Sequence, residues 1–212
     1  MARIRSASSY ARRGPVREPY DTVLIVCEGA KTEPNYFNGM KNVYRLSSAN
    51  VAVTNAPGTD PLSVVQHTET LMAADDYDRV FSVFDRDGHA NFLTAVARVA
   101  NHARGRAGTW QAITSTPCFE LWLSLHFAYS TAPVVATGAN SAGDNAVRAL
   151  RAHMPTYAKG DKDIFAKVAD RVDNAIANAT KLTRHNAANG STNPSTDMHT
   201  LVNYLRRLKP VE

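Results

Sequence analysis

The sequence predicts an α/β fold, in which helices flank a mostly parallel sheet. Residues 22–27 form a continuous apolar run rich in β-branched side chains, and residues 79–84 form a second, largely apolar run. Runs that are apolar on both faces are typical of strands inside a parallel sheet. Segments with apolar residues at helical spacing follow both runs, and strand and helix alternate up to about residue 130. This alternation favours parallel strands joined by helices that cover both faces of the sheet.

The first part of the chain contains three of the expected strands. The strand at residues 22–27 precedes a helix with Pro34 in its first turn, where proline is tolerated. A short strand at residues 51–53 ends at a Pro-Gly pair. Asp60 is suited to cap the second helix, because a proline follows at the first helical position. The third strand, residues 79–84, ends on acidic residues, as the first strand does.

The middle of the chain continues this alternation. A helix with its apolar stripe within residues 92–100 follows the third strand. Residues 110–113 are expected to form a fourth strand, which leads into an apolar helix at residues 119–125.

The pattern changes after residue 130. We expect a loop at residues 132–143, helices around residues 147–150 and 164–176, and an exposed polar loop at residues 184–191. Asn193-Pro194 is expected to start the last helix. The chain therefore divides into an N-terminal arm at residues 1–19, an α/β core at 20–130, and a helical extension at 131–212 packed on that core.

Composition and charge limit the class of protein. A chain of 212 residues with 44% hydrophobic and 20% charged residues is long enough to form a single folded domain. Two cysteines, Cys27 and Cys118, provide no disulfide framework and suit a reduced cytoplasm, where we expect the protein to be located. No apolar stretch approaches the length of a membrane span, so we expect no membrane association.

The N-terminal arm is basic, within a chain of net charge +5. Residues 1–19 contain five arginines and one acid, together with serine, glycine and proline, which predicts a flexible segment. Arg12 and Arg13 are candidates for contacts with nucleic-acid phosphates. A solvated tail without a partner, or an organelle transit peptide, would have a similar composition.

Acidic residues follow two of the predicted strands. Glu28 comes directly after the first, and Asp85 and Asp87 come after the third. Ligands of open parallel sheets bind beyond the carboxyl ends of the strands, so we expect these carboxylates to lie close together. Like charges in a small volume repel one another unless a cation separates them, and Mg²⁺ or Mn²⁺ prefers oxygen ligands. A structural Asp-Gly turn and a polar strand end are the alternatives for these residues.

The same residues resemble a known family. The run 23–29, with Asp85-Arg86-Asp87 further on, is similar to the Toprim pattern of topoisomerases, primases and OLD-type nucleases, all of which use Mg²⁺. The longer string from Cys27 to Phe37 resembles the start of the RloB family, Toprim-like proteins of bacterial restriction and phage-defence loci. Residues 115–127 and 193–199 resemble that family as well. The resemblance implies a Toprim-like core.

The resemblance also implies roles for individual residues. Glu28 matches the Toprim glutamate, a metal ligand or general acid/base, and Asp85 and Asp87 match the metal-binding pair. Glu33 is placed like the second acid of OLD-type nucleases, which would allow two metal ions. Glu120, a charge within an apolar run, is a further candidate ligand.

Three basic side chains complete the candidate set. Lys31 is the nearest candidate to offset charge on a scissile phosphate, as a catalytic and nucleic-acid-binding residue. His89 and His126 are candidates for proton transfer, although a lone histidine is more often structural.

The function that the resemblance implies is a Mg²⁺-dependent endonuclease, the effector of an antiphage system. An AAA- or ABC-type ATPase is the expected partner, and the chain itself contains no phosphate-binding loop of the Gly-x-x-x-x-Gly-Lys-Ser/Thr type. One alternative is a Toprim-like module that binds nucleic acid or a partner without catalysis. Another is a phosphatase of the haloacid dehalogenase type, because residues 83–88 resemble its Asp-x-Asp-Gly signature, with Asp85 as the nucleophile.

Overall fold

A five-stranded sheet organises the chain, as a computed structural model shows over residues 21–46, 50–103 and 109–208. The strand order is β2-β1-β3-β4-β5. The first four strands are parallel, and β5 pairs antiparallel with β4. The predicted α/β class with a mostly parallel sheet is confirmed. The strands are β1 (Val23–Cys27), β2 (Val51–Asn55), β3 (Arg79–Asp85), β4 (Trp110–Thr116) and β5 (Ser195–Thr196).

Helices connect these strands and make up most of the C-terminal part. No helix in the described ranges is both long enough and apolar enough to span a membrane. The helices are α1 (Thr32–Val43), α2 (Pro61–Ala74), α3 (Phe92–Ala103), α4 (Glu120–Leu125), α5 (Ala142–Arg151), α6 (Ile164–Val168), the short 3₁₀ helix η1 (Ala169–Arg171), α7 (Val172–Asn189) and α8 (Met198–Arg207).

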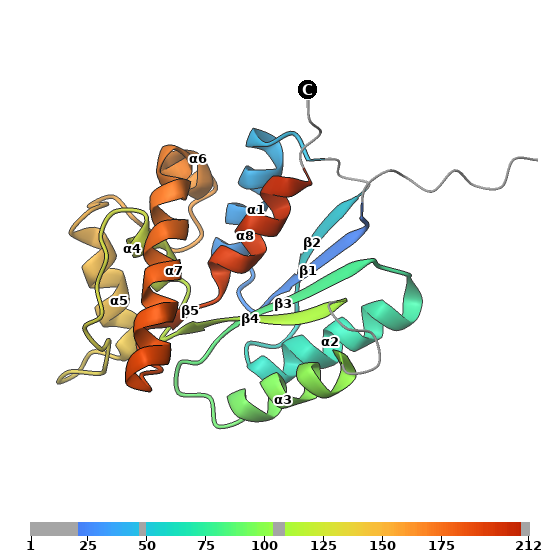
Figure 1. The fold of residues 1–212 in the computed structure, drawn as a ribbon, viewed down its shortest axis with the longest axis horizontal. Helices are drawn as coiled ribbons and strands as arrows, with labels where there is room; N and C mark the ends of the chain where they lie inside the picture. The colour runs from blue at the N-terminus through green and yellow to red at the C-terminus, as the bar shows by residue number, and fades with distance from the viewer. Residues whose placement is uncertain (1–20, 47–49, 104–108, 209–212) are drawn as a thin grey trace, which may run out of the picture.

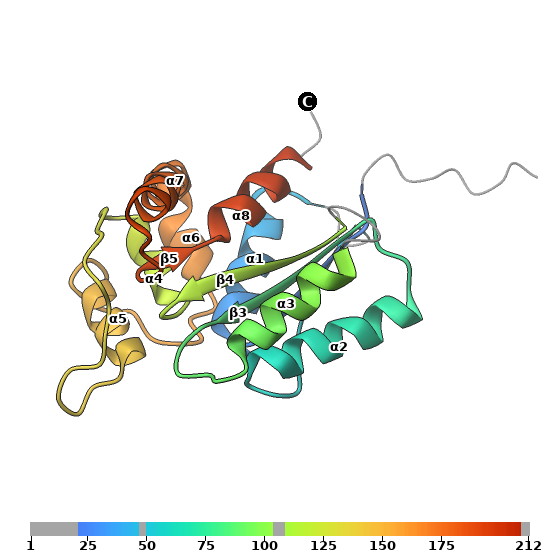
Figure 2. The same cartoon turned by 60° about the horizontal axis from the view of Figure 1, so that its bottom comes forward.

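The sheet separates two apolar layers. Strand β1 is buried along its whole length, and its side chains alternate between the layers, with Leu24 and Val26 in one and Ile25 in the other. Helices α2 and α3 complete the first layer, whereas α1, α4, α7 and α8 contribute to the second. Figure 2 shows α2 and α3 on one side of the sheet and α1 and α8 on the other. Burial on both faces explains why β1 has no polar side chain.

The C-terminal helices lie at the end of the sheet toward which the parallel strands run. Figure 1 shows α4, α5, α6 and α7 gathered beyond the carboxyl ends of β3 and β4. Helix α6 packs closely on α1 at Gly39, where an added Cβ would lie 2.7 Å from Cβ of the buried Phe165. The larger apolar layer is continuous from β1 to α8. The C-terminal helices therefore share a core with the sheet.

Two sequence-based predictions in the C-terminal part are wrong. Residues 184–191 were expected to form a loop, but α7 continues to Asn189 and ends at Gly190, which adopts a left-handed conformation with φ of 65°. Most of these residues are exposed, so their polar composition reflects a solvated helix end. The last helix begins at Met198, not at Asn193-Pro194, because residues 195–196 add strand β5 to the sheet. Strand β5 has only two residues, too few for a recognisable pattern.

Gly39→Ala should destabilise the protein by about 1–3 kcal/mol, because the methyl group forces α1 and α6 apart. The cost should exceed the gain of roughly 1 kcal/mol that alanine has over glycine in a helix. Gly143→Ala in α5 is a matched control, since its added Cβ would come no closer than 3.7 Å to the nearest atoms. It should be neutral or slightly stabilising. Urea unfolding of both variants measures the two effects, and equal effects would contradict the close packing at Gly39.

Candidate active site

The two central strands bring two acidic side chains together. Strands β1 and β3 are parallel, with Cys27 level with Val83, so Glu28 and Asp85 reach the same edge of the sheet. The carboxylate Oε2 of Glu28 accepts a hydrogen bond of 2.9 Å from the backbone N–H of Asp85. The backbone N–H of Glu28 donates in turn to the carbonyl of Val83, at 2.9 Å. Glu28 is thereby held across the end of β3.

Asp85, the last residue of β3, lies at the centre of the acidic cluster. Its Oδ2 accepts a hydrogen bond of 3.1 Å from the backbone N–H of Phe119, just before α4. Burial raises the pKa of Asp85 well above its usual value, and the negative charges of Glu33 and Glu28 raise it further. Burial withholds the hydration that would stabilise the ionised carboxylate. The ionised form of Asp85 is therefore favoured by a nearby cation.

Glu33, in the first turn of α1, is a third member of the cluster. Its side chain is buried, and its carboxylate occupies the space that a Cβ at Gly29 would need. Glycine is therefore required at position 29 for this arrangement. Burial raises the pKa of Glu33 to about 7, with smaller contributions from the charges of Glu120 and Glu28.

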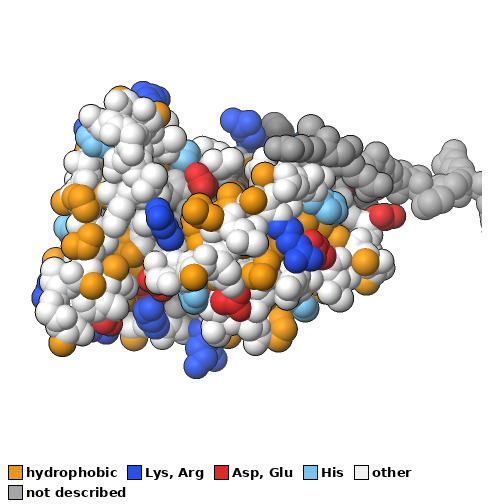
Figure 3. All heavy atoms as spheres, turned by 90° about the horizontal axis from the view of Figure 1, so that it is seen from below, with side chains coloured by type: hydrophobic (Ala, Val, Ile, Leu, Met, Phe, Trp, Pro, Cys, Tyr) orange, Lys and Arg blue, Asp and Glu red, His pale blue; other side chains and the backbone are white. Residues whose placement is uncertain are grey.

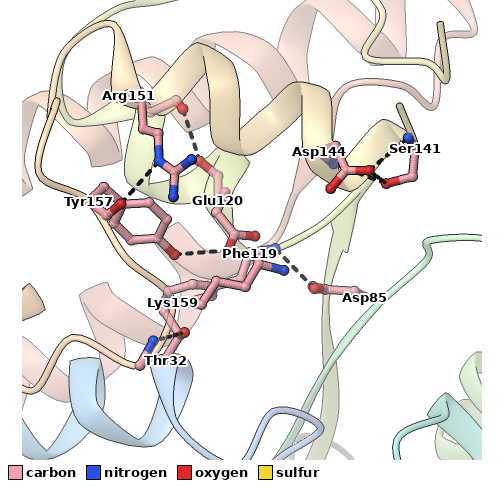
Figure 4. A network of polar contacts seen from close by, with 11 residues as sticks. Thr32, Asp85, Phe119, Glu120, Ser141, Asp144, Arg151, Tyr157 and Lys159 are labelled. Carbon is pink, nitrogen blue, oxygen red and sulfur yellow. Dashed lines mark hydrogen bonds and ion pairs between the residues drawn. The ribbon is translucent and has the colours of Figure 1, made fainter. Parts of the chain in front are cut away.

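Glu120 is the fourth member and the first residue of α4. Only 3% of its surface is exposed. The hydroxyl of Tyr157 donates a hydrogen bond of 2.8 Å to its Oε1, and Nζ of Lys159 lies 3.5 Å from the same oxygen. Figure 4 shows both side chains directed toward Glu120 from the segment between α5 and α6. A buried carboxylate needs such partners.

These four carboxylates line a cavity of about 540 Å³ at the carboxyl edge of the sheet. Residues at the end of β2 and after it, within 55–59, also line this cavity. Two lysines, Lys31 and Lys159, belong to the lining as well. The lining therefore combines four acidic side chains with two basic ones.

Asp87 occupies a different place from the other acids. It is exposed, does not line the cavity, and its carboxylate faces the start of α5, near Gly143. Its backbone has a φ of 33°, a left-handed conformation that costs energy for any residue with a side chain. The positive φ at this turn belongs to Asp87 and not to the glycine that follows it, Gly88. Partial desolvation of its carboxylate raises the pKa of Asp87, whereas the positive charges of Lys159 and His89 lower it.

The two candidate histidines have different surroundings. Nε2 of His89 lies 3.3 Å from Oε1 of Glu28, so His89 is placed to exchange a proton with this carboxylate. His126 is fully buried next to Tyr36 and Trp122, and burial lowers its pKa to about 4. His126 therefore belongs to the aromatic core and is remote from solvent.

The remaining candidate residues also differ in their surroundings. The aliphatic part of Lys31 lies against Gly160, and the residue is exposed at the mouth of the cavity. Arg12 and Arg13 are outside the described residues. Cys27 and Cys118 are buried, and burial raises the pKa of both thiols, as expected for small apolar side chains without a nucleophilic role.

Tyr157 and Lys159 are not among the site residues predicted from the sequence. Both lie in the C-terminal part, 37 and 39 residues away from Glu120, and no local pattern marks them. Only the fold brings them to the cavity.

The donor set fits a hard divalent cation in its chemistry. Glu28, Glu33, Asp85 and Glu120 offer only oxygen atoms, the ligands that Mg²⁺ and Mn²⁺ prefer. Burial is the largest cause of the raised pKa values of Glu28, Glu33 and Asp85, and neighbouring carboxylates raise them further, so a cation would favour their ionised forms. Within the described ranges, however, no three His, Cys, Asp or Glu side chains stand close enough to form a complete ligand shell. Cation binding would therefore require small side-chain movements.

Comparison with known proteins gives one result. A sequence model of the family described as "RloB-like protein" matches residues 23–205, which cover most of the chain. The matched region includes all four carboxylates of the cavity, Asp87 and Lys159. No curated protein matches the sequence significantly.

The raised pKa of Glu33 predicts how the stability of the metal-free protein depends on pH. Between about pH 4.5 and 7 the folded protein keeps a proton on Glu33 that the unfolded chain loses, so the free energy of unfolding should fall as the pH rises. Glu33→Gln removes this titration and should be more stable than the wild type above pH 7, by on the order of 2–3 kcal/mol.

Urea unfolding at several pH values in EDTA measures this difference. Asp76→Asn, which changes an exposed acid outside the cavity, should keep the wild-type profile. Identical pH profiles for Glu33→Gln and the wild type would contradict the burial of an ionisable Glu33.

Proposed function

Because this chain belongs to the RloB-like protein family, we propose that it is a Mg²⁺- or Mn²⁺-dependent endonuclease of the Toprim type, acting in bacterial antiphage defence. The observation that carries the proposal is the convergence of four carboxylates on one cavity at the carboxyl edge of a parallel sheet. Open α/β sheets bind their ligands at this edge. Clustered acids with raised pKa values in a cleft are typical of catalytic sites.

The cavity residues have distinct roles in this proposal. Glu28, Glu33, Asp85 and Glu120 would hold the cation, with Asp87 at the border of the site. A bound Mg²⁺ supplies a Lewis acid that lowers the pKa of water and stabilises charge on a phosphate.

The protein's own groups would orient the reaction. The backbone N–H of Asp85 fixes one oxygen of Glu28, and His89 stands beside the other oxygen. This pair is therefore suited to accept a proton from the attacking water. Lys31, at the cavity mouth, remains a candidate contact for the nucleic-acid backbone.

The same geometry argues against the phosphatase alternative. A phosphatase of that type needs Asp85 as an ionised nucleophile free to attack phosphorus. Here Oδ2 of Asp85 accepts a hydrogen bond from Phe119, and burial among other acids favours the protonated form. Asp85 is better suited to bind a cation than to form an aspartyl-phosphate.

Nucleic acid and an ATPase are the proposed partners. The sequence pI of about 9.3 favours a polyanionic substrate. Because the chain has no phosphate-binding loop, an ATP-driven step would belong to a separate AAA- or ABC-type protein.

Asp85→Asn should abolish metal-dependent cleavage, because it removes a charge at the centre of the cluster while keeping the shape of the side chain. We expect the rate to fall by at least about 100-fold, the effect of losing one group that stabilises transition-state charge. The assay uses labelled DNA and RNA with Mg²⁺, Mn²⁺ or EDTA, with and without the ATPase. Titration calorimetry with Mn²⁺ should show that the variant also loses cation binding.

Asp76→Asn, an exposed acid between α2 and β3, is the matched control and should cleave like the wild type. Absence of both cleavage and Mn²⁺ binding in the wild type, with and without the ATPase, would refute the nuclease. It would favour a module that binds nucleic acid or a partner without catalysis. Cleavage that persists in EDTA would refute the metal dependence.

A further inference from the structure

A short segment of the C-terminal part contributes Lys159 and Gly160 to the lining of the cavity. This segment, residues 157–161, lies between α5 and α6 and is anchored to the start of α1. The N–H of Gly160 donates to Oγ1 of Thr32 at 2.9 Å, and Nδ2 of Asn35 donates to the carbonyl of Gly160 at 3.0 Å. Gly160 has a φ of 82°, which glycine adopts without strain. These contacts fix the backbone on one side of Lys159.

The other side of the segment is anchored as well. Tyr157 is buried, its hydroxyl donates to Glu120, and its carbonyl accepts a hydrogen bond of 3.1 Å from Nε of Arg151. Figure 4 shows this network around Glu120 and Lys159. The backbone is therefore held in place on both sides of Lys159, whose side chain lies at the border of the cavity.

The protein holds the ammonium group of Lys159 only weakly. It lies 3.5 Å from Oε1 of Glu120, an oxygen that already accepts the shorter hydrogen bond from Tyr157. The Lys159 side chain is 65% exposed, and its ammonium has three donors. Water screens the lysine end of this ion pair, and Glu120 keeps the hydrogen bond from Tyr157 when the ammonium moves away. Donors therefore remain for a ligand in the cavity.

Lys159 is in direct contact with the acidic cluster, because its Nζ lies 3.5 Å from Oε1 of Glu120. Lys31 is exposed at the border of the cavity, and its aliphatic part rests on Gly160. Lys159, which no sequence pattern indicated, is therefore the lysine placed beside the buried Glu120.

An anionic ligand needs such a group. A phosphate that enters a cavity lined by four carboxylates is repelled unless cations offset the charge. Figure 3 shows acidic and basic side chains interspersed on the face seen from below Figure 1, without a large basic patch in this view. On that face, attraction of a phosphate would depend on individual cations.

We propose that Lys159 binds the phosphate group of the substrate in the carboxylate-lined cavity, as a phosphate ligand supplied by the C-terminal part. This inference rests on the proposed function for the identity of the substrate, a nucleic-acid strand. Lysine suits the role because its ammonium is a compact charge on a flexible stem and can move from Glu120 to the phosphate. Segment 157–161 sets the position from which it moves.

Lys159→Gln tests the proposal through binding, without a need for turnover. Anisotropy of fluorescent single-stranded DNA and RNA oligonucleotides is measured with Ca²⁺ in place of Mg²⁺. Lys159→Gln should weaken binding by about tenfold, the equivalent of one lost charge-assisted contact, and Lys159→Arg should restore most of it. Lys162→Gln removes an equal charge from an exposed residue outside the cavity, so it should change binding less than about twofold. Lys31→Gln should have an intermediate effect.

Cleavage rates distinguish this inference from the proposed function. In Mg²⁺, kcat/KM of Lys159→Gln should fall by about 30- to 100-fold, measured at a temperature at which the variant remains folded. If the wild type binds oligonucleotides but never cleaves them, the nuclease proposal fails. The proposed role of Lys159 is then still tested by the anisotropy measurement. Binding that is equal in Lys159→Gln and the wild type would overturn the inference. So would equal losses in Lys159→Gln and Lys162→Gln, and so would absence of binding by the wild type.

Discussion

The parallel pairing of β1 with β3 is the constraint on which the candidate site depends. Both strands are buried, so charged side chains are confined to their ends, and parallel pairing puts both carboxyl ends at one edge. Glu28 and Asp85 meet there, each held by a backbone N–H of the other strand or of the segment after β4. Burial favours the protonated forms of Asp85 and of the neighbouring Glu33, which limits the negative charge at this edge. A cation that binds there would allow these carboxyl groups to ionise.

Features that depend on local pattern could be predicted from the sequence. The buried run of β1 and the acidic ends of β1 and β3 indicated a parallel sheet and the place of Glu28 and Asp85. The same approach failed where tertiary contacts decide the structure. Strand β5 forms only because β4 offers it an edge, and α7 continues through polar residues because its exposed end needs no apolar side chains. Lys159 is placed at the cavity by the contact of its neighbour Gly160 with Thr32 and by its own contact with Glu120, both distant in sequence.

The acidic cluster links cation binding to proton release. Glu33 keeps a proton up to about pH 7, and burial raises the pKa of Asp85 as well. A metal ion coordinates the deprotonated carboxylate, so each binding event near neutral pH would displace protons. The heat of binding measured by calorimetry would then depend on the ionisation enthalpy of the buffer. The number of protons displaced would report how many of these acids act as ligands.

The position of segment 157–161 has a consequence for the synthesis of the protein. The four parallel strands and the acids of the cavity lie within residues 23–120, and a growing chain folds from its N-terminal side as it leaves the ribosome. The wall that contains Lys159 and Gly160 is added only later, and it packs through α6 against α1. An incomplete chain would carry the acids without segment 157–161. The cavity would therefore acquire its complete wall only after residues 157–161 have been synthesised and α6 has packed against α1, so that ligand binding requires this later part of the chain.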